Sequence, residues 1–264
     1  MLSTLRVLEE VAQRQPVGVS EIARVTEMPK STVQRCLVTL RTAGWLRIVD
    51  TERSRWGVTS KPLGIGLTAA GEAGLRDVAG PYLESLRDTT NETIHFAVRD
   101  GNSLLILMRR DSGQAVRTYV EVGTRAPLHA TSCGMAILAK MPPAEAEAAL
   151  DGEMKKYTDT TIVSRQALLE EVERTRARGY AVNDASWWRP DVCAIGAAVV
   201  NAAGKPIAAL AVSVPSSRFY RQNETFYARH ALDTARAGSR KSCTRPRHSG
   251  GGAPVAGHRC PTTA

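Results

Sequence analysis

The side chains whose types and spacing are best suited to chemistry lie between residues 30 and 39 of this sequence. Arg pairs well with guanine and Gln with adenine, whereas Ser, Thr and Lys near a helix N-terminus suit phosphate oxygens. On a helix, Gln34 and Arg35 fall opposite the apolar side formed by Val33, Leu37 and Leu40. This pattern predicts a helix that reads the major groove of DNA. The predicted DNA contacts are Ser20, Lys30, Ser31, Thr32, Gln34, Arg35, Thr39, Arg53 and Arg55.

Other elements must present that helix. Apolar spacing predicts a first helix over residues 2–14, Ser20 is a plausible N-cap for a second, and Pro29 suits the first turn of a third. Two short strands around a charged turn are expected within residues 45–58. This order of elements predicts a winged helix-turn-helix, the DNA-binding domain, over residues 1–62.

The rest of the chain changes its pattern twice. Residues 63–90 have helical spacing with Pro81 inside, which predicts a linker helix that kinks or restarts near Gly80 and Pro81. From Thr93 the apolar period becomes that of strands, and residues 91–237 are expected to form a mixed α/β domain with a largely antiparallel sheet. Strands are predicted at 94–99, 104–108, 115–120, 194–200 and 207–214, and helices at 131–140, 164–178 and 223–237.

Charge is unevenly distributed along the chain. The net charge is +9, but residues 61–235 hold equal numbers of basic and acidic side chains. Residues 1–60 hold nine Lys/Arg against six Asp/Glu, and residues 236–264 hold six Lys/Arg and no acid. The basic head suits a polyanion, and residues 238–264 are expected to be a disordered basic tail. No apolar run is long enough to span a membrane and no signal peptide is recognisable, which predicts a cytoplasmic protein without a membrane partner.

Cysteine chemistry offers an alternative function. Five cysteines without a Cys-x-x-Cys pair indicate no disulfide framework, and Cys243, His248, His258 and Cys260 have a spacing that fits no zinc motif, so neither a metal nor a cofactor is expected. Cys193 with His129 could act in a thiol-dependent, hydrolase-like enzyme. Because no cation adjoins Cys193 to lower its thiol pKa, an inert thiol lining a pocket is favoured, and no catalytic residue is assigned.

Beyond the head, several segments occur in a recognisable order. They include Met28–Arg35, Val122–Gly123 with Pro127–Ala139, Gly179–Asp184 with Val192–Ile195, and Ala208–Arg218. Together these segments resemble the IclR family of bacterial transcriptional regulators over roughly residues 3–236. The resemblance implies a dimeric or tetrameric repressor or activator whose C-terminal domain, similar to GAF-type sensor domains, binds a small metabolite. The effector-binding residues that we expect are His129, Ala130, Thr131, Asp184, Cys193 and Ser213.

The chain also departs from the family pattern near the expected pocket. Met135 stands where a Lys is usual, and the acidic pair usual after the Asp184 region is replaced by Ala185-Ser186-Trp187-Trp188. The two Trp could stack on an aromatic effector or could cover the core. Likewise Ser213 could bind a carboxylate or only neighbouring backbone, and Asp184 could face the pocket or cap a turn.

The sequence therefore predicts an α+β protein: a winged helix-turn-helix, a linker helix and a GAF-like effector-binding domain. Its predicted function is ligand-responsive transcriptional regulation, as a repressor that senses a small organic or aromatic acid. A homodimer or homotetramer would bind a palindromic operator in double-stranded DNA. The alternatives are the thiol enzyme and a DNA-binding protein without a ligand.

Overall fold

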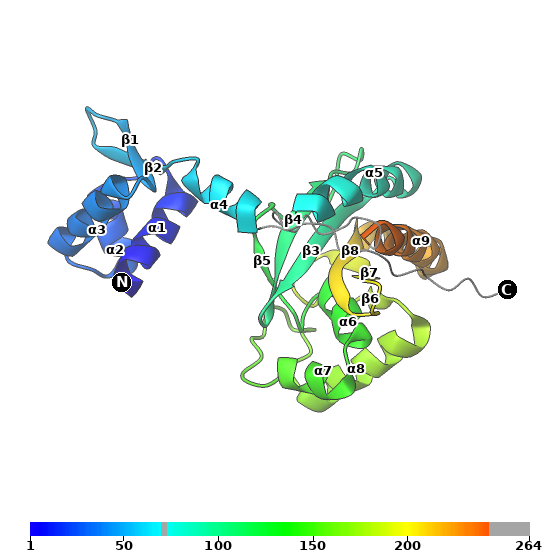
Figure 1. The fold of residues 1–264 in the computed structure, drawn as a ribbon. Coiled ribbons are helices and arrows are strands. Elements are labelled where there is room, and N and C mark those ends of the chain that lie inside the picture. The colour runs from blue at the N-terminus through cyan, green and yellow to red at the C-terminus, as the bar shows by residue number, and fades with distance from the viewer. Residues whose placement is uncertain (70–72, 243–264) are drawn as a thin grey trace, which may run out of the picture. The chain divides into compact units, whose positions relative to one another are not determined.

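The computed structural model describes residues 1–69 and 73–242, in which the chain forms two compact units divided between Gly74 and Leu75 (Figure 1). The first unit is the predicted winged helix-turn-helix. The second is the predicted mixed α/β domain, so the fold class is confirmed. Within the described residues, no helix has both the length and the apolar character needed to cross a membrane.

The N-terminal unit is built around three helices and a hairpin. Its elements are α1 (Leu2–Arg14), α2 (Val19–Thr26), α3 (Lys30–Thr42), β1 (Leu46–Asp50), β2 (Arg55–Val58) and α4 (Lys61–Ala69). Val7, Ile22, Leu37 and Trp56 come from four of these elements and share one buried cluster. The apolar side chains that the spacing within each helix or strand places on one side are therefore the ones that pack into the shared core.

The start of α2 corrects one sequence expectation. Gly18, in extended conformation, is the N-cap, and Ser20 lies inside the first turn with an exposed side chain. The helix begins two residues earlier than predicted, and its first residue, the half-buried Val19, packs against the core. Glu27, with φ 58°, ends α2 in the left-handed conformation and makes the sharp turn into α3.

The C-terminal unit contains one antiparallel sheet of six strands. The strands are β3 (Thr93–Asp100), β4 (Ser103–Arg110), β5 (Arg125–Pro127), β6 (Ala181–Asn183), β7 (Val192–Val200) and β8 (Pro206–Pro215), in the spatial order β5-β4-β3-β8-β7-β6. The strand predicted at residues 115–120 is wrong, since that segment has no strand pairing. Thr118 of this segment is held instead by side-chain hydrogen bonds: its hydroxyl donates to the Ser213 carbonyl at 3.3 Å, and its carbonyl accepts from Thr93 Oγ1 at 3.2 Å.

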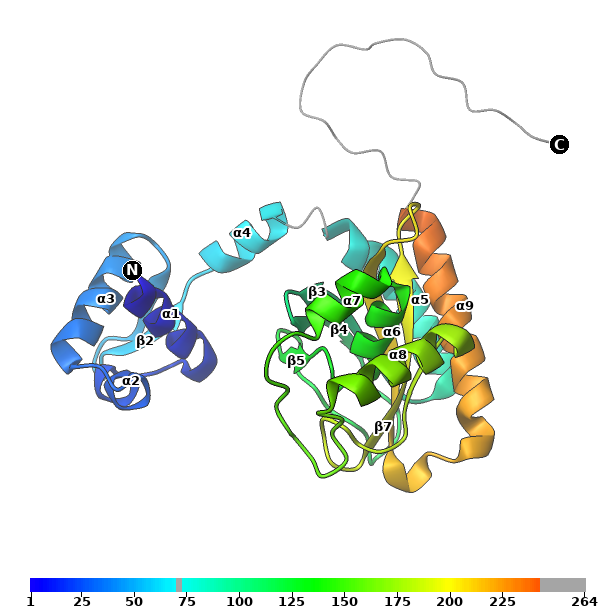
Figure 2. The ribbon, with the colours of Figure 1, turned by 90° about the horizontal axis from the view of Figure 1, so that it is seen from below.

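Helices cover both faces of this sheet, as Figure 2 shows. One face is packed by α5 (Ala73–Thr90) and α9 (Glu224–Ser242), and the other by α6 (Ser132–Lys140), α7 (Pro143–Ala149) and α8 (Arg165–Arg178). Two 3-10 turns, η1 (Ser216–Arg218) and η2 (Arg221–Asn223), lead into α9.

Helices α5 and α9 differ from the helices predicted from the sequence. Helix α5 continues through Gly80 and Pro81, so of the predicted kink or restart the restart is wrong, and the kink stays a prediction. Helix α9 runs to Ser242, past the predicted end at residue 237. The remainder of the predicted tail, with Cys243 and Cys260, lies outside the described residues. The domain boundaries expected at 62, 90 and 237 stay predictions.

The N-terminus of α6 approaches the sheet closely, and two glycines make this possible. A Cβ on Gly196 of β7 would lie 2.4 Å from the carbonyl oxygen of Ser132, and a Cβ on Gly134 would lie 1.8 Å from that of Leu128. Any side chain at either position would push the helix away. These glycines therefore fix the first turn of α6 against the sheet, next to the cavity described below.

Candidate functional sites

The outward side of α3 carries polar side chains that the fold itself does not use. Val33 and Leu37 are buried, whereas Gln34 and Arg35 are exposed. Among the described residues, no hydrogen bond or ion pair engages the Arg35 guanidinium. A free guanidinium and a free amide on one helix face are the groups that can form paired hydrogen bonds with base edges.

The two arginines of the wing that were predicted to contact DNA have different surroundings. Arg53 is exposed in the turn between β1 and β2, where its backbone N–H donates to Asp50 Oδ1 over 2.9 Å. Arg55 Nη1 lies 3.3 Å from Glu21 Oε2 of α2, with both side chains about 40% exposed. Such a surface pair is worth at most about 1 kcal/mol. Arg55 therefore links the wing to α2, and DNA contact there would have to compete with Glu21.

The remaining predicted DNA contacts lie near helix starts. Ser20 is in the first turn of α2, while Lys30, Ser31 and Thr32 begin α3, and all but the half-buried Thr32 are exposed. Thr39, two turns further along α3, is exposed as well. A helix N-terminus presents free N–H groups and positive potential, which favour phosphate. The whole predicted set is accessible on one unit, and its contact with DNA stays a prediction.

The C-terminal unit contains a cavity of about 660 Å³ between the sheet and the N-terminus of α6. Its walls come from β3, β4, β7 and β8, from the loops around residues 116–120 and 188–191, and from η1. Leu104, Ile106, Ala126 and Ala211 supply apolar surface. A cavity of this size with mixed walls is typical of small-molecule sites.

Thr131 and Ala130 line this cavity at the start of α6. The Thr131 hydroxyl accepts a hydrogen bond from Gly134 N at 3.1 Å and donates to the Pro127 carbonyl at 3.0 Å, so it is the N-cap of α6. Its hydroxyl is occupied by this capping role. The positive end of the helix nevertheless faces the cavity, since Ser132 and Cys133 also line it.

His95 and Ser213 form the polar part of the cavity floor. Ser213 Oγ lies 2.9 Å from His95 Nδ1, and both side chains are about 95% buried. Burial, reinforced by the Arg109 charge, lowers the pKa of His95 to about 4, so the imidazole is neutral at pH 7. Ser213 thus has a side-chain partner, which neither of the two alternatives in the sequence analysis included.

The charged side chains that line the cavity are two arginines and one aspartate. Arg117, Arg189 and Asp191 are all exposed at its edge. No ion pair is formed by either arginine within residues 1–69 and 73–242, and the guanidinium of Arg189 lies 4.7 Å from the centre of the Trp188 ring. The balance of charge therefore favours an anion.

The other three predicted effector residues do not line the cavity. His129 Nε2 is 3.1 Å from the Lys155 carbonyl, and Asp184 forms an ion pair with Arg221 at 2.9 Å. Cys193 lies directly opposite Val214, so it faces the α5 and α9 side of the sheet, whereas its neighbour Ala194 faces the cavity. Of the six predicted effector-binding residues, Ala130, Thr131 and Ser213 line the cavity. Roles of the other three in ligand binding stay predictions.

The two tryptophans have different positions. Trp187 is 6% exposed and belongs to the core between the sheet and α6, while Trp188 lines the cavity. Sequence reasoning did not identify His95, Arg117 or Arg189. The signal that could have identified His95 is its position as a histidine inside the apolar run Ile94–Val98.

The geometry does not support an activated thiol. Burial raises the pKa of Cys193 to about 11, and the charge of Asp184 adds to the effect. Burial likewise raises the pKa of Cys133, which lines the cavity, to about 12. No hydrogen bond joins Cys193 to His129 in the part of the chain that the structure describes. Both thiols are protonated at neutral pH and are poor nucleophiles.

Comparison with known proteins agrees with both halves of this picture. The sequence model of the IclR helix-turn-helix domain matches residues 4–49, and that of the bacterial transcriptional regulator IclR C-terminal domain matches residues 67–240. The chain is 31% identical over 215 residues to the HTH-type transcriptional regulator BhcR of Paracoccus denitrificans, covering 81% of this chain and 76% of BhcR.

Two further relatives carry more specific names. The HTH-type transcriptional repressor AllR of Escherichia coli is 30% identical, with 83% of this chain and 80% of AllR covered. An IclR homologue of Microbacterium hydrocarbonoxydans, solved with 4-hydroxybenzoate, has a TM-score of 0.76 at 22% identity, with 90% of this chain and 96% of that chain covered. The chain therefore belongs to the IclR family of bacterial transcriptional regulators, which joins a helix-turn-helix DNA-binding domain to a ligand-binding one.

Proposed function

We propose that this regulator is a repressor that releases its DNA when the anion of a small organic acid binds in the cavity. The observation that carries the proposal is the cavity's charge: Arg117 and Arg189 against Asp191, with the N-terminus of α6 adding positive potential. The apolar walls would hold the body of the acid. AllR is named a repressor, and the Microbacterium homologue holds an aromatic acid, but the cavity's own side chains define the ligand class.

Contacts at the root of α5 support a path from cavity to DNA-binding unit. Arg218 of η1 binds the buried carboxylate of Glu92 through two hydrogen bonds of 2.7 and 2.8 Å, and Ser216 and Ser217 of the same turn line the cavity. Thr93 Oγ1 donates to the Thr118 carbonyl, also at the cavity, over 3.2 Å. Both cavity segments are therefore bonded to the junction between α5 and β3. A ligand that favours one arrangement of these segments shifts the position of α5.

Exposed apolar side chains on the N-terminal unit support self-association. Leu2 and Leu5 of α1 are 84% and 50% exposed, and Leu63 and Ile65 of α4 are 62% and 45% exposed. We propose that these residues are covered in a homodimer, which itself can pair into a tetramer. Two recognition helices about 34 Å apart then bind the halves of a palindromic operator. Because bacterial DNA lies in the cytoplasm, the regulator acts there.

We further infer that the protein is not an enzyme. The family relationship and the protonated state of Cys193 support this, since a thiol nucleophile requires a lowered pKa.

The test uses the full chain and a library of short duplexes from the DNA that flanks its own gene. Fluorescence anisotropy first identifies the bound duplex. Benzoate and its neutral isostere benzamide are then added. We expect benzoate to release the duplex and benzamide to have no effect below about tenfold higher concentration. Release by benzamide alone, or no release by a panel of small carboxylic acids at millimolar concentrations, contradicts the proposal.

A further inference from the structure

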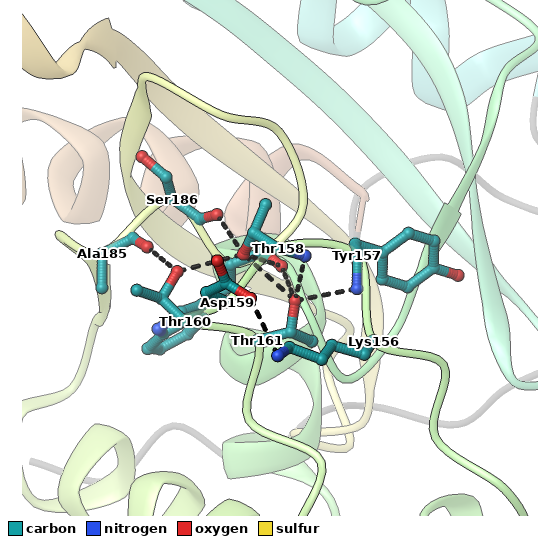
Figure 3. A network of polar contacts seen from close by, with 9 residues as sticks. Lys156, Tyr157, Thr158, Asp159, Thr160, Thr161, Ala185 and Ser186 are labelled. Atoms are coloured by element: carbon teal, nitrogen blue, oxygen red, sulfur yellow. Dashed lines mark hydrogen bonds and ion pairs between the residues drawn. The ribbon is translucent and has the colours of Figure 1, made fainter.

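The segment that leads into Trp188 and Arg189 is held by side-chain hydrogen bonds from three threonines, two of whose carbonyl partners, Ala185 and Ser186, are labelled in Figure 3. Thr158 Oγ1 donates to the Ser186 carbonyl at 2.9 Å and Thr161 Oγ1 to the Trp187 carbonyl at 2.6 Å, while Thr160 Oγ1 donates to the Ala185 carbonyl. We call Thr158, Thr160 and Thr161 the threonine clasp. It connects three successive carbonyls to a distant part of the chain.

The same loop is fixed from two other sides. Asn183 Oδ1 accepts hydrogen bonds from the backbone N–H groups of Ala185 and Trp187, at 3.3 and 3.2 Å. The Trp187 side chain is buried in the core. The backbone that leads into Trp188 is therefore fixed on one side by hydrogen bonds and on the other by apolar packing.

Arg189 emerges from this fixed loop with its charge uncompensated. Its guanidinium carbon is 4.7 Å from the centre of the Trp188 ring, a cation–π contact, and both residues line the cavity. In the described part of the chain no carboxylate pairs with Arg189. A stacked guanidinium keeps its N–H fork available, and less conformational freedom is lost when it binds an anion.

Arg117 is the competing cation at the cavity, and its setting differs. It lies in the segment without strand or helix between β4 and β5, where Val116 before it is 66% exposed and Thr118 after it is buried, with its hydroxyl donating to the Ser213 carbonyl at 3.3 Å. The guanidinium that lies over the Tyr119 ring, at 4.0 Å, belongs to Arg109 and not to Arg117. Arg117 contributes positive potential to the cavity, but within residues 1–69 and 73–242 no hydrogen bond, ion pair or ring contact orients its guanidinium.

We propose that Arg189, stacked on Trp188 and positioned by the threonine clasp, is the residue that binds the carboxylate of the effector. Trp188 acts as a positioning residue for the guanidinium. The proposal deepens the proposed function, on which it rests, by assigning the acid group to one side chain. It gives Trp188 and Arg189, which both line the cavity, a role in ligand choice.

The test compares affinities for benzoate and benzamide by calorimetry on the full-length protein and four variants. Arg189→Gln removes the cation, and because Arg189 is exposed this variant is expected to fold. We expect benzoate to bind it at least about tenfold more weakly, with benzamide affinity changed less than twofold. Arg189→Lys, which keeps the charge without the fork, should recover only part of the loss.

Matched variants separate this contact from general electrostatics. Arg117→Gln removes one charge at the same cavity and should weaken benzoate binding less than about threefold. Trp188→Leu should weaken benzoate severalfold without altering the thermal midpoint by more than a few degrees. An unchanged benzoate affinity in Arg189→Gln, or equal losses in Arg189→Gln and Arg117→Gln, overturns this inference and leaves the acid-responsive repressor intact. Failure of the wild-type protein to bind any carboxylate overturns both.

Discussion

The two units of this protein differ in how their functional groups are assembled. In the N-terminal unit, the predicted DNA contacts on α3 lie within ten residues of one another and need only a helix with its other side buried. In the C-terminal unit, the cavity collects His95, Arg117, Thr131, Arg189 and Ser213 from segments far apart in the chain, between residues 95 and 213. The predicted DNA-binding surface is thus local in sequence, whereas the cavity depends on how distant segments fold together.

The difference extends to what holds each unit together. Among its described residues, the N-terminal unit has one small apolar cluster and one ion pair between residues far apart in the chain, Arg55 with Glu21, at its surface. In the C-terminal unit the pair of Glu92 and Arg218 joins residues 126 apart in the chain, with the Glu92 side chain 4% exposed. Buried polar links are costly when broken, so the sensor is the more vulnerable unit to single substitutions.

The largest expected effect comes from breaking that buried pair. Arg218→Ala leaves the Glu92 carboxylate without its partner, and we expect the C-terminal unit to lose about 3–5 kcal/mol of stability. Hydrogen exchange followed by mass spectrometry can measure both units in one sample. The backbone amides of the N-terminal unit should remain as protected from exchange as in the wild type.

A matched control for this change is available on α9. Arg236→Ala removes an exposed pair with Asp233, and its cost should stay below about 1 kcal/mol. Equal losses in the two variants, or a parallel loss in both units, would refute the contrast between them.

The second effect depends on pH and on His95. Its pKa is lowered from 6.5 to about 4 in the folded protein, so the unfolded chain binds the proton more readily between those values. The contribution of His95 to the free energy of unfolding of the C-terminal unit is therefore fully present well above pH 6.5. It should fall by about 2 kcal/mol by pH 5. The N-terminal unit contains no histidine and should change little over the same range.

Denaturant titrations at pH 7.5, 6.5, 5.5 and 5 measure this dependence. In the variant His95→Leu the fall between pH 6.5 and pH 5 should disappear from the C-terminal unit, whatever the variant's stability at pH 7.5. A fall of the same size with leucine in place would show that another group titrates.

The smallest effect distinguishes the two kinds of DNA contact. Arg35→Ala should weaken binding to the best duplex by about 1–3 kcal/mol and relax its sequence preference, because a base contact is lost. Arg53→Ala should weaken all duplexes alike and reduce the slope of log affinity against log salt by about one.

Arg229→Ala, an exposed residue of α9, is the control for charge alone and should leave both quantities unchanged. In all three variants, affinity for benzoate should equal that of the wild type. If Arg35→Ala reads the same sequence with the same affinity, α3 is not the recognition helix.

Sequence reasoning succeeded where local spacing decides the structure. The helices near residues 2–14, 131–140 and 164–178 and the long strands of the sheet were predicted because apolar periodicity is a local signal. It failed at residues 115–120, where the chain has strand-like composition but pairs with no strand, and where Thr118 is held by side-chain hydrogen bonds to Thr93 and Ser213. Strand pairing is a long-range property that composition does not contain.

The candidate site shows the same division. Ala130, Thr131 and Ser213 are at the cavity as expected, but Cys193 faces the opposite side of β7, because a shift of one residue along a strand reverses the side chain. His95 and Arg189 were missed because their importance depends on partners 118 residues away and on a loop held by the threonine clasp.

The central place of β8 in the sheet has a consequence for biosynthesis. This strand, residues 206–215, joins the β3-β4-β5 half to the β6-β7 half, so the sensor cannot close until the ribosome has delivered nearly all of it. At bacterial elongation rates the winged helix emerges roughly 10–30 s earlier. During that interval the nascent chain has a complete DNA-binding unit, but its ligand-binding domain is not yet complete.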